Sequence, residues 1–95
     1  MNKYEVMFII QAELEDQPRT ELIERFTSLI AKQGGTVDKL DEWGKRRLAY
    51  PIEKQAEGYY VLMYMSAGPE VPRELERNFS ISEYVIRYLV TRIEE

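Results

Sequence analysis

Two kinds of hydrophobic periodicity alternate along this chain, and the alternation limits the folds available to it. Residues 3–11 begin with polar and apolar residues in turn and then become continuously apolar, which is typical of a buried strand. Residues 22–30 instead carry apolar side chains at helical spacing, with Pro18 suited to a first helical turn and Gly34-Gly35 suited to the helix end. The chain therefore predicts a strand followed by a helix.

The middle of the chain predicts two further strands. Residues 36–50 have extended character, with a bulge or bend expected at Gly44 and an end at Pro51, because proline cannot donate a hydrogen bond to a sheet. The polar stretch 52–58 is expected to be a loop. Residues 59–65, which are rich in tyrosine and methionine, form the clearest strand pattern in the sequence.

The remaining residues predict a shorter helix and a last strand. Val71 begins an apolar series that recurs every four residues, Pro72 lies in its first turn, and residues 84–92 are again strand-like. The expected order is β-α-β-β-α-β in a single domain over residues 1–95, since 95 residues leave no room for a second core. That order defines an α+β, ferredoxin-like fold, a four-stranded antiparallel sheet with two helices on one face.

Both faces of the expected central strands, the first and the third, are apolar. If Val6, Phe8 and Ile10 point toward the helices, Met7 and Ile9 point the other way. In residues 59–65 either parity carries bulky side chains. Two helices cannot cover both faces, and we interpret the remaining apolar surface as a partner site. The alternative is that these tyrosines and methionines are simply half-exposed.

The net charge of −4 conceals an uneven distribution of charge. Five acids and one base lie between residues 13 and 24, whereas four bases and one acid lie between residues 43 and 54. An acidic chain argues against nucleic-acid binding only when its charges are mixed. The basic segment is suited to phosphate contact; the alternative is that its cations protect an edge strand from aggregation.

The composition excludes most kinds of enzyme site. The chain has no histidine and no cysteine, so no Ser-His-Asp or Cys-His constellation can be built from it. It also has no glycine-rich phosphate loop, and its carboxylates fall mostly on helix faces. We therefore expect a binding protein with no catalytic residues, metal site or cofactor. No apolar run approaches the roughly 18 to 20 residues needed to span a bilayer, so no membrane association is expected.

Part of the third strand is similar to the RNA-recognition motif, which has the same topology. The match is partial, because Glu57 replaces the leading base and Tyr60 replaces a small residue. It carries little weight by itself.

A more specific resemblance covers essentially the whole chain. The segment Trp43-Gly44-Lys45-Arg46-Arg47-Leu48-Ala49-Tyr50-Pro51-Ile52, with the opening Tyr4-Glu5-Val6 and the closing Val85-Ile86-Arg87-Tyr88-Leu89-Val90, resembles the bacterial small-subunit ribosomal protein number six family. The resemblance implies a ferredoxin-like, non-catalytic ribosomal protein of the cytoplasm. It also implies binding to the central domain of small-subunit ribosomal RNA, as a heterodimer with small-subunit ribosomal protein number eighteen. The isolated chain is then expected to be a monomer.

The resemblance and the surface patterns together assign two sets of residues. The expected RNA-binding residues are Lys3, Lys45, Arg46, Arg47, Lys54, Arg87 and Arg92. The expected partner-interface residues are Met7, Ile9, Tyr50, Tyr60, Leu62 and Tyr64. Adjacent residues of a strand point to opposite faces, so one of Arg46 and Arg47 is available for the protein partner or for an ion pair instead.

A hypothesis from another class also fits the apolar face. A self-associating ferredoxin-like module could bind a small ligand across its open sheet. Sedimentation separates the two hypotheses, since a stable homodimer favours the self-associating module and a monomer favours the ribosomal protein.

Overall fold

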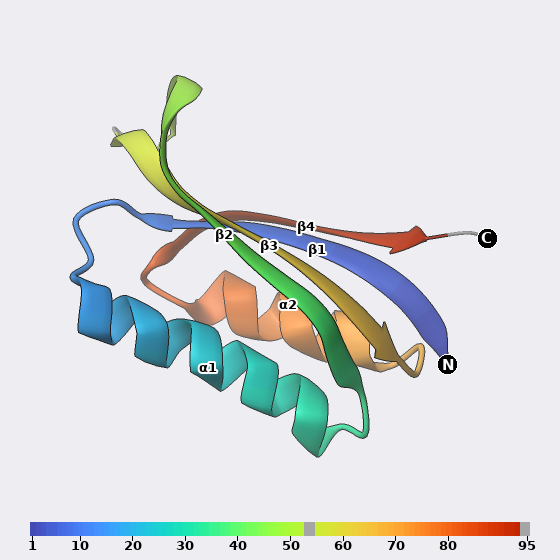
Figure 1. The fold of residues 1–95 in the computed structure, drawn as a ribbon. Helices are drawn as coiled ribbons and strands as arrows, with labels where there is room; N and C mark the ends of the chain where they lie inside the picture. The colour runs from blue at the N-terminus through green and yellow to red at the C-terminus, as the bar shows by residue number, and fades with distance from the viewer. Residues whose placement is uncertain (53–54, 94–95) are drawn as a thin grey trace.

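The predicted order of elements is confirmed by a computed structural model, which describes residues 1–52 and 55–93. Its elements are β1 (Asn2–Gln11), α1 (Asp16–Lys32), β2 (Thr36–Ile52), β3 (Gln55–Ala67), α2 (Val71–Ile81) and β4 (Val85–Ile93). The strands form one antiparallel sheet in the order β2-β3-β1-β4, so β1 and β3 are central, as predicted. Both helices lie on one face of this sheet, and we call the opposite face the open face (Figure 1).

The hydrophobic core lies between the helices and the sheet. Val6, Phe8 and Ile10 of β1 are fully buried there, together with alternate residues of β3 from Val61 to Met65. Three phenylalanine rings meet at the centre, with Phe26 from α1 and Phe79 from α2 each within 5.4 Å of Phe8 or of one another. Burying a large apolar side chain contributes about 1.5–3 kcal/mol, so burial of the apolar residues in the period-two and helical patterns stabilises the fold substantially.

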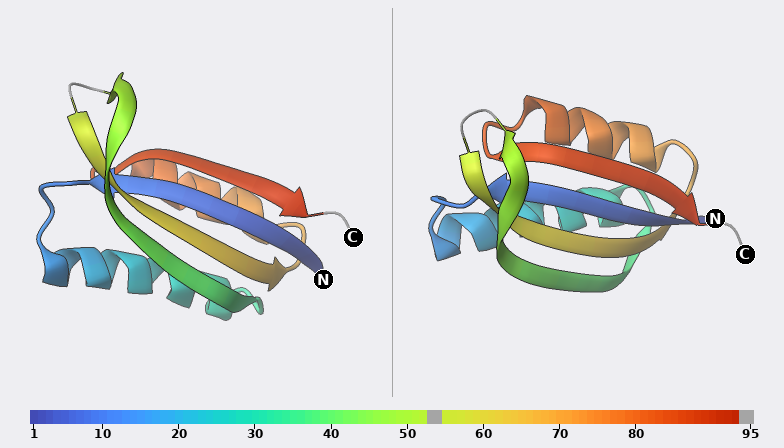
Figure 2. Two further views of the ribbon diagram at one scale, coloured as in Figure 1. Left: turned by 45° about the horizontal axis from the view of Figure 1, so that its top comes forward. Right: turned by 90° about the horizontal axis from the view of Figure 1, so that it is seen from above.

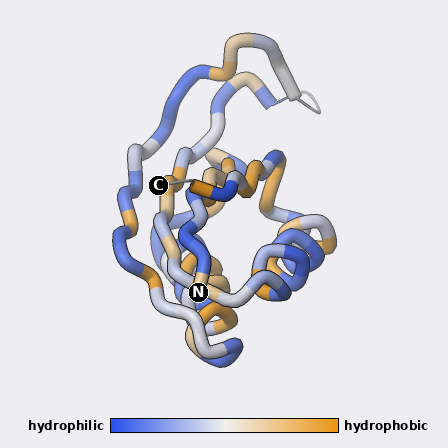
Figure 3. The backbone as a smooth tube through the Cα atoms, turned by 90° about the vertical axis from the view of Figure 1, so that its right-hand side faces the viewer, coloured by the Kyte–Doolittle hydropathy of each residue, from blue (hydrophilic) through white to orange (hydrophobic). Residues whose placement is uncertain are grey.

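A bulge at Gly44 bends the hairpin that joins β2 and β3. Gly44 has a φ of +86°, which favours glycine, and the pairing with β3 shifts between Glu42 and Gly44. Beyond the bulge the two strands leave the plane of the sheet and rise over the open face (Figure 2). We call residues 45–52 and 55–58 the hairpin arm. Figure 3 shows the arm from another side, arching above the sheet.

The expectation of a loop over residues 52–58 is wrong for the residues that the structure describes. β3 already begins at Gln55, which pairs with Ile52, and β2 continues through Pro51. Ladder hydrogen bonds join backbone groups, so a polar sequence can pair when its partner strand is held beside it. Proline is tolerated because β2 is an edge strand of the sheet. Glu53 and Lys54 lie outside the described residues.

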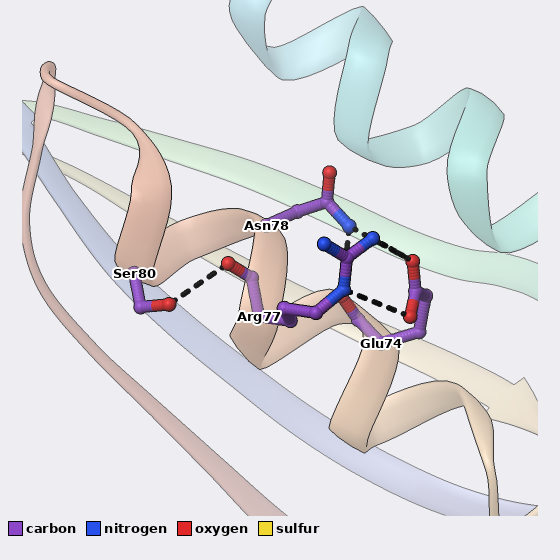
Figure 4. Close-up of polar contacts among 4 residues, drawn as sticks. All are labelled: Glu74, Arg77, Asn78 and Ser80. Atoms are coloured by element: carbon purple, nitrogen blue, oxygen red, sulfur yellow. Dashed lines mark hydrogen bonds and ion pairs between the residues drawn. The ribbon is translucent and has the colours of Figure 1, made fainter.

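Side chains along α2 make ordinary helix-stabilising contacts with one another and with the backbone (Figure 4). Glu74 and Arg77 form an ion pair at 2.7 Å, and the Asn78 side-chain amide donates to the Glu74 carbonyl oxygen at 2.8 Å. The hydrogen bond from Arg77 holds the pKa of Glu74 below its usual value. Such contacts between residues three and four apart are ordinary surface stabilisation of a helix. In the described part of the chain, neither helix is long and apolar enough to cross a membrane.

Candidate functional site

The open face has an apolar centre built by the two central strands. Met7 and Ile9 of β1 lie beside Leu62 and Tyr60 of β3 in antiparallel register. Ile9 and Leu62 are buried, whereas Met7 and Tyr60 are half-buried. The alternation of side chains along the two strands predicts this apolar second face. Because alternate residues of a strand share a face, the predicted residues Met7, Ile9, Tyr60 and Leu62 lie together on the open face.

Residues of the two outer strands, β4 and β2, extend the apolar centre on both sides. Leu89 of β4 pairs with Met7, and its side chain is 64% exposed. At the other edge the indole of Trp43 stacks on the Tyr60 ring, with centroids 6.4 Å apart and planes 9° apart. We call this apolar centre, with Trp43 and Leu89 added, the open-face patch; its members are Met7, Ile9, Trp43, Tyr60, Leu62 and Leu89. Sequence reasoning missed both outer residues, although the parity of β4 could have identified Leu89.

The patch includes a shallow hollow against β4. The hollow has a volume of about 240 Å³ and is lined by Met7, Ile9, Tyr60, Arg87, Tyr88 and Leu89. Arg87 pairs with Ile9 in the register, so a guanidinium borders an apolar depression. This arrangement suits an apolar partner group that lies close to an anion.

The hairpin arm covers one end of the open face. Leu48 is buried beside Ile9 and Gly58, and a Cβ at position 58 would overlap Cγ2 of Ile9 and lie 3.6 Å from Leu48 Cδ2. Glycine at this point therefore allows the arm to fold onto β1. Two residues further along the arm, the Tyr50 hydroxyl accepts a hydrogen bond from Nη1 of Arg87 at 3.2 Å. Because β2 and β4 are the two edges of the sheet, this contact joins opposite edges.

The other end of the open face is polar. Tyr64 lies between Glu5 and Lys39 in the register, and Lys39 is 3.5 Å from an Asp41 carboxylate oxygen. The Ser66 hydroxyl donates to Asp38 at 2.6 Å. Tyr64 thus lies at the border between the apolar and polar ends, whereas the other predicted partner residues lie in the apolar part or on the arm.

The predicted RNA-binding cations do not gather on a single surface. Three of them occupy strand positions on the open face: Lys3, Arg46 and Arg87. The alternate positions, on the helix side of the strands, hold Lys45, Arg47 and Arg92. Arg46 and Arg47 pair with Gly58 and Glu57 respectively, so their side chains leave the arm on opposite sides. Lys54 lies outside the described residues.

Two of these cations have surroundings that differ in charge. Lys45 lines hollows together with Glu13 and Asp16 at the acidic start of α1. Arg92 instead donates from Nη2 to the neutral side-chain oxygen of Asn2 at 3.1 Å. A cation beside carboxylates is less available to phosphate than one held by a neutral group. Arg92 is therefore better placed than Lys45 to contact phosphate.

A separate network joins the start of α1 to the sheet. The Arg19 guanidinium lies 3.9 Å from the centre of the Tyr59 ring and also bonds Asp16 at 2.8 Å. The Tyr59 hydroxyl donates to Glu42 at 3.0 Å. Burial, together with this hydrogen bond, raises the pKa of Tyr59 above its usual value. The network fixes the helix on the core side of the sheet, away from the open-face patch.

Within residues 1–52 and 55–93, no three side chains of the metal-ligating types come together as a metal site would require. The most prominent surface among these residues combines an apolar patch, a hairpin arm that covers one end of it, and Arg87 at its margin. Fold and surface together define a ferredoxin-like binding protein.

Comparison with known proteins gives the family. The model of the family described as ribosomal protein S6 matches residues 3–92. The small ribosomal subunit protein bS6 of Caldanaerobacter subterraneus subsp. tengcongensis is 50% identical over 95 residues, with 100% of each chain covered. The bS6 of Moorella thermoacetica is 52% identical, covering 100% of this chain and 97% of that one. The chain belongs to the ribosomal protein S6 family.

A solved structure shows the same fold. The crystal structure of 30S ribosomal protein S6 from Thermotoga maritima superposes with a TM-score of 0.92 at 32% identity, covering 97% of this chain and 87% of that one. The predicted family and fold class are confirmed. As a member of this family, the chain has its place in the small ribosomal subunit, in the bacterial cytoplasm.

Proposed function

We propose that this protein is a non-catalytic constituent of the small ribosomal subunit that binds the central domain of its ribosomal RNA as a heterodimer with small-subunit ribosomal protein number eighteen, and so aids assembly. The observation that carries this proposal is the open-face patch with Arg87 at its margin. An apolar surface of this kind suits a protein partner, and a cation beside it suits RNA phosphate.

The composition of the patch supports a protein partner. Trp43, Tyr60 and Met7 are of the residue types that are enriched in interface cores. Leu89 is 64% exposed, and covering it would remove apolar surface from water at about 25 cal/mol per Å². The patch is continuous with the hairpin arm, so a partner that covers the patch also reaches Tyr50.

The charge distribution supports RNA binding that depends on the partner. The chain carries a net charge of −4, and its cations are divided between two sides of the sheet. Each phosphate contact releases counterions, so a chain that makes few such contacts binds weakly by itself. A basic partner supplies the remaining contacts, and the affinity for RNA then rises.

The proposal is tested by measuring RNA binding of the chain alone and with the partner. Titration of a central-domain RNA fragment by gel shift is expected to show weak binding alone and much tighter binding by the heterodimer. Equal affinities would contradict the proposal.

A matched pair of variants tests the surface. Leu89→Asp introduces a charge into the open-face patch and is expected to prevent heterodimer formation. Ile81→Asp is the control, because Ile81 is 68% exposed but lies on α2, on the opposite face of the sheet. If Ile81→Asp weakens the heterodimer as much as Leu89→Asp does, the open face is not the partner site.

The self-associating module is the less favoured alternative. Its ligand would have to occupy the open-face hollow, whose volume of about 240 Å³ lies below the 300–1,000 Å³ typical of ligand sites. Sedimentation of the isolated protein is expected to show a monomer, and a stable homodimer would favour the alternative instead.

A further inference from the structure

The hydrogen bond between Tyr50 and Arg87 connects the two surfaces of the proposed function. Tyr50 lies on the hairpin arm, and its side chain is 60% exposed. Arg87 lies on β4 at the margin of the open-face patch, 37 residues further along the chain. A contact between such distant residues exists because the arm bends at Gly44 and folds across the open face.

The chemistry of this contact differs from that of the arginine ion pairs on the helices. Arg77 and Arg19 bond carboxylates at 2.7 and 2.8 Å, so their charge is largely compensated. Arg87 instead bonds a neutral hydroxyl, which uses one of the five guanidinium N–H donors and adds no negative charge beside the cation. Such a guanidinium is held in place and can still bind phosphate.

We propose that Tyr50 is a positioning residue for Arg87, holding its guanidinium for contact with RNA phosphate and so linking partner binding to RNA binding. The inference rests on the proposed function. An unrestrained arginine loses rotamer freedom when it contacts phosphate, which opposes binding. The Tyr50 hydroxyl reduces that loss, because the orientation is set before RNA arrives.

The arm explains how the partner takes part. Leu48 packs beside Ile9 and Gly58, which fixes the arm over β1, and Tyr50 follows two residues later. A protein that covers the exposed Tyr50 ring and the open-face patch holds the arm down. The hydroxyl then stays within hydrogen-bond distance of Arg87, and the cation is oriented most firmly in the heterodimer.

The test is a double-mutant cycle on RNA binding by the purified heterodimer. Tyr50→Phe removes only the hydroxyl and is expected to weaken RNA binding by about 3- to 10-fold, the effect of losing one intramolecular hydrogen bond of typical net strength. Its unfolding midpoint is expected to match that of the wild type, and RNA binding is measured with the partner in excess, so that all of the chain is in the heterodimer. In the Arg87→Ala background, Tyr50→Phe is expected to cause no further loss, because the hydroxyl acts through the guanidinium.

Tyr84→Phe is the matched control, since this tyrosine is also exposed but lies beside the ends of α1 and α2, and its RNA affinity is expected to be unchanged. Wild-type RNA binding by Tyr50→Phe would overturn the inference, as would a loss that persists in the Arg87→Ala background. If Arg87→Ala weakens RNA binding and Tyr50→Phe does not, the inference fails alone. If Arg87→Ala binds RNA as tightly as the wild type, the RNA contact assigned to Arg87 in the proposed function fails as well.

Discussion

Trp43 stacks on Tyr60, and this pair carries the open-face patch from the central strand β3 onto the edge strand β2. Trp43 immediately precedes Gly44, where the pairing of the two strands shifts. A bulge re-aims the side chains next to it, and here it leaves the indole parallel to the tyrosine ring rather than free in solvent. The same backbone irregularity thus directs the arm and places an aromatic residue on the patch.

The first prediction concerns this indole. Trp43→Ala is expected to lower the affinity for the protein partner by at least about tenfold, because tryptophan is among the residue types that most often dominate the binding energy of an interface. Isothermal titration calorimetry measures the change. Tyr84→Ala is the control, since both side chains are 43% exposed but Tyr84 lies beside the ends of the helices. Equal losses from the two variants would exclude a specific role for Trp43.

The second prediction concerns the close approach of the arm to β1. Gly58→Ala is expected to destabilise the protein by about 1–3 kcal/mol, the cost typical of overpacking, because the new Cβ overlaps Cγ2 of Ile9. Chemical denaturation gives the free energy of unfolding. Adding Ile9→Leu, which removes the branch at Cβ, is expected to recover part of the loss. Full stability of Gly58→Ala would mean that the arm is not packed against Ile9.

The third prediction concerns the pH dependence of α2. Arg77 lowers the pKa of Glu74 from its ordinary value of 4.5, chiefly through its hydrogen bond. A carboxyl with a lowered folded-state pKa stabilises the fold above its unfolded pKa, and that stabilisation is lost as the pH falls through the folded value. Carbon-13 NMR titration of Arg77→Gln is expected to show the Glu74 pKa moving up toward 4.5. An unchanged pKa would exclude Arg77 as the cause.

The fourth prediction concerns the salt dependence of RNA binding by the heterodimer. Replacing both Lys54 and Arg87 with glutamate is expected to flatten the plot of log affinity against log salt, since each lost phosphate contact reduces its slope by about 0.7–0.9. Filter binding at several salt concentrations gives the slope. Arg73→Glu, an exposed change on α2, is the control and is expected to leave the slope unaltered. An unaltered slope in the double variant would mean that neither residue meets phosphate.

Local periodicity was sufficient to predict the elements and the core. The side chains of Val6, Phe8 and Ile10 alternate with Met7 and Ile9 along one strand, so the division between core and open face follows from the period of the backbone. The bend at Gly44 was also predictable, because glycine readily adopts a positive φ. The strand at residues 55–58 was not, because its polar side chains carry no strand signal and its pairing depends on the neighbouring strand.

By itself, the sequence determined the order of the elements, the buried face of each strand, the bend at Gly44 and the resemblance to one family. Only the tertiary structure decided where the arm goes after the bend, and therefore that Leu48 and Ile9 both come close to Gly58 and that Tyr50 meets Arg87. The physical reason is the range of the interactions. Hydrophobic periodicity and turn preference depend on residues that are close together in the sequence. A contact between residues 37 apart depends instead on the summed twist and bend of the strands between them.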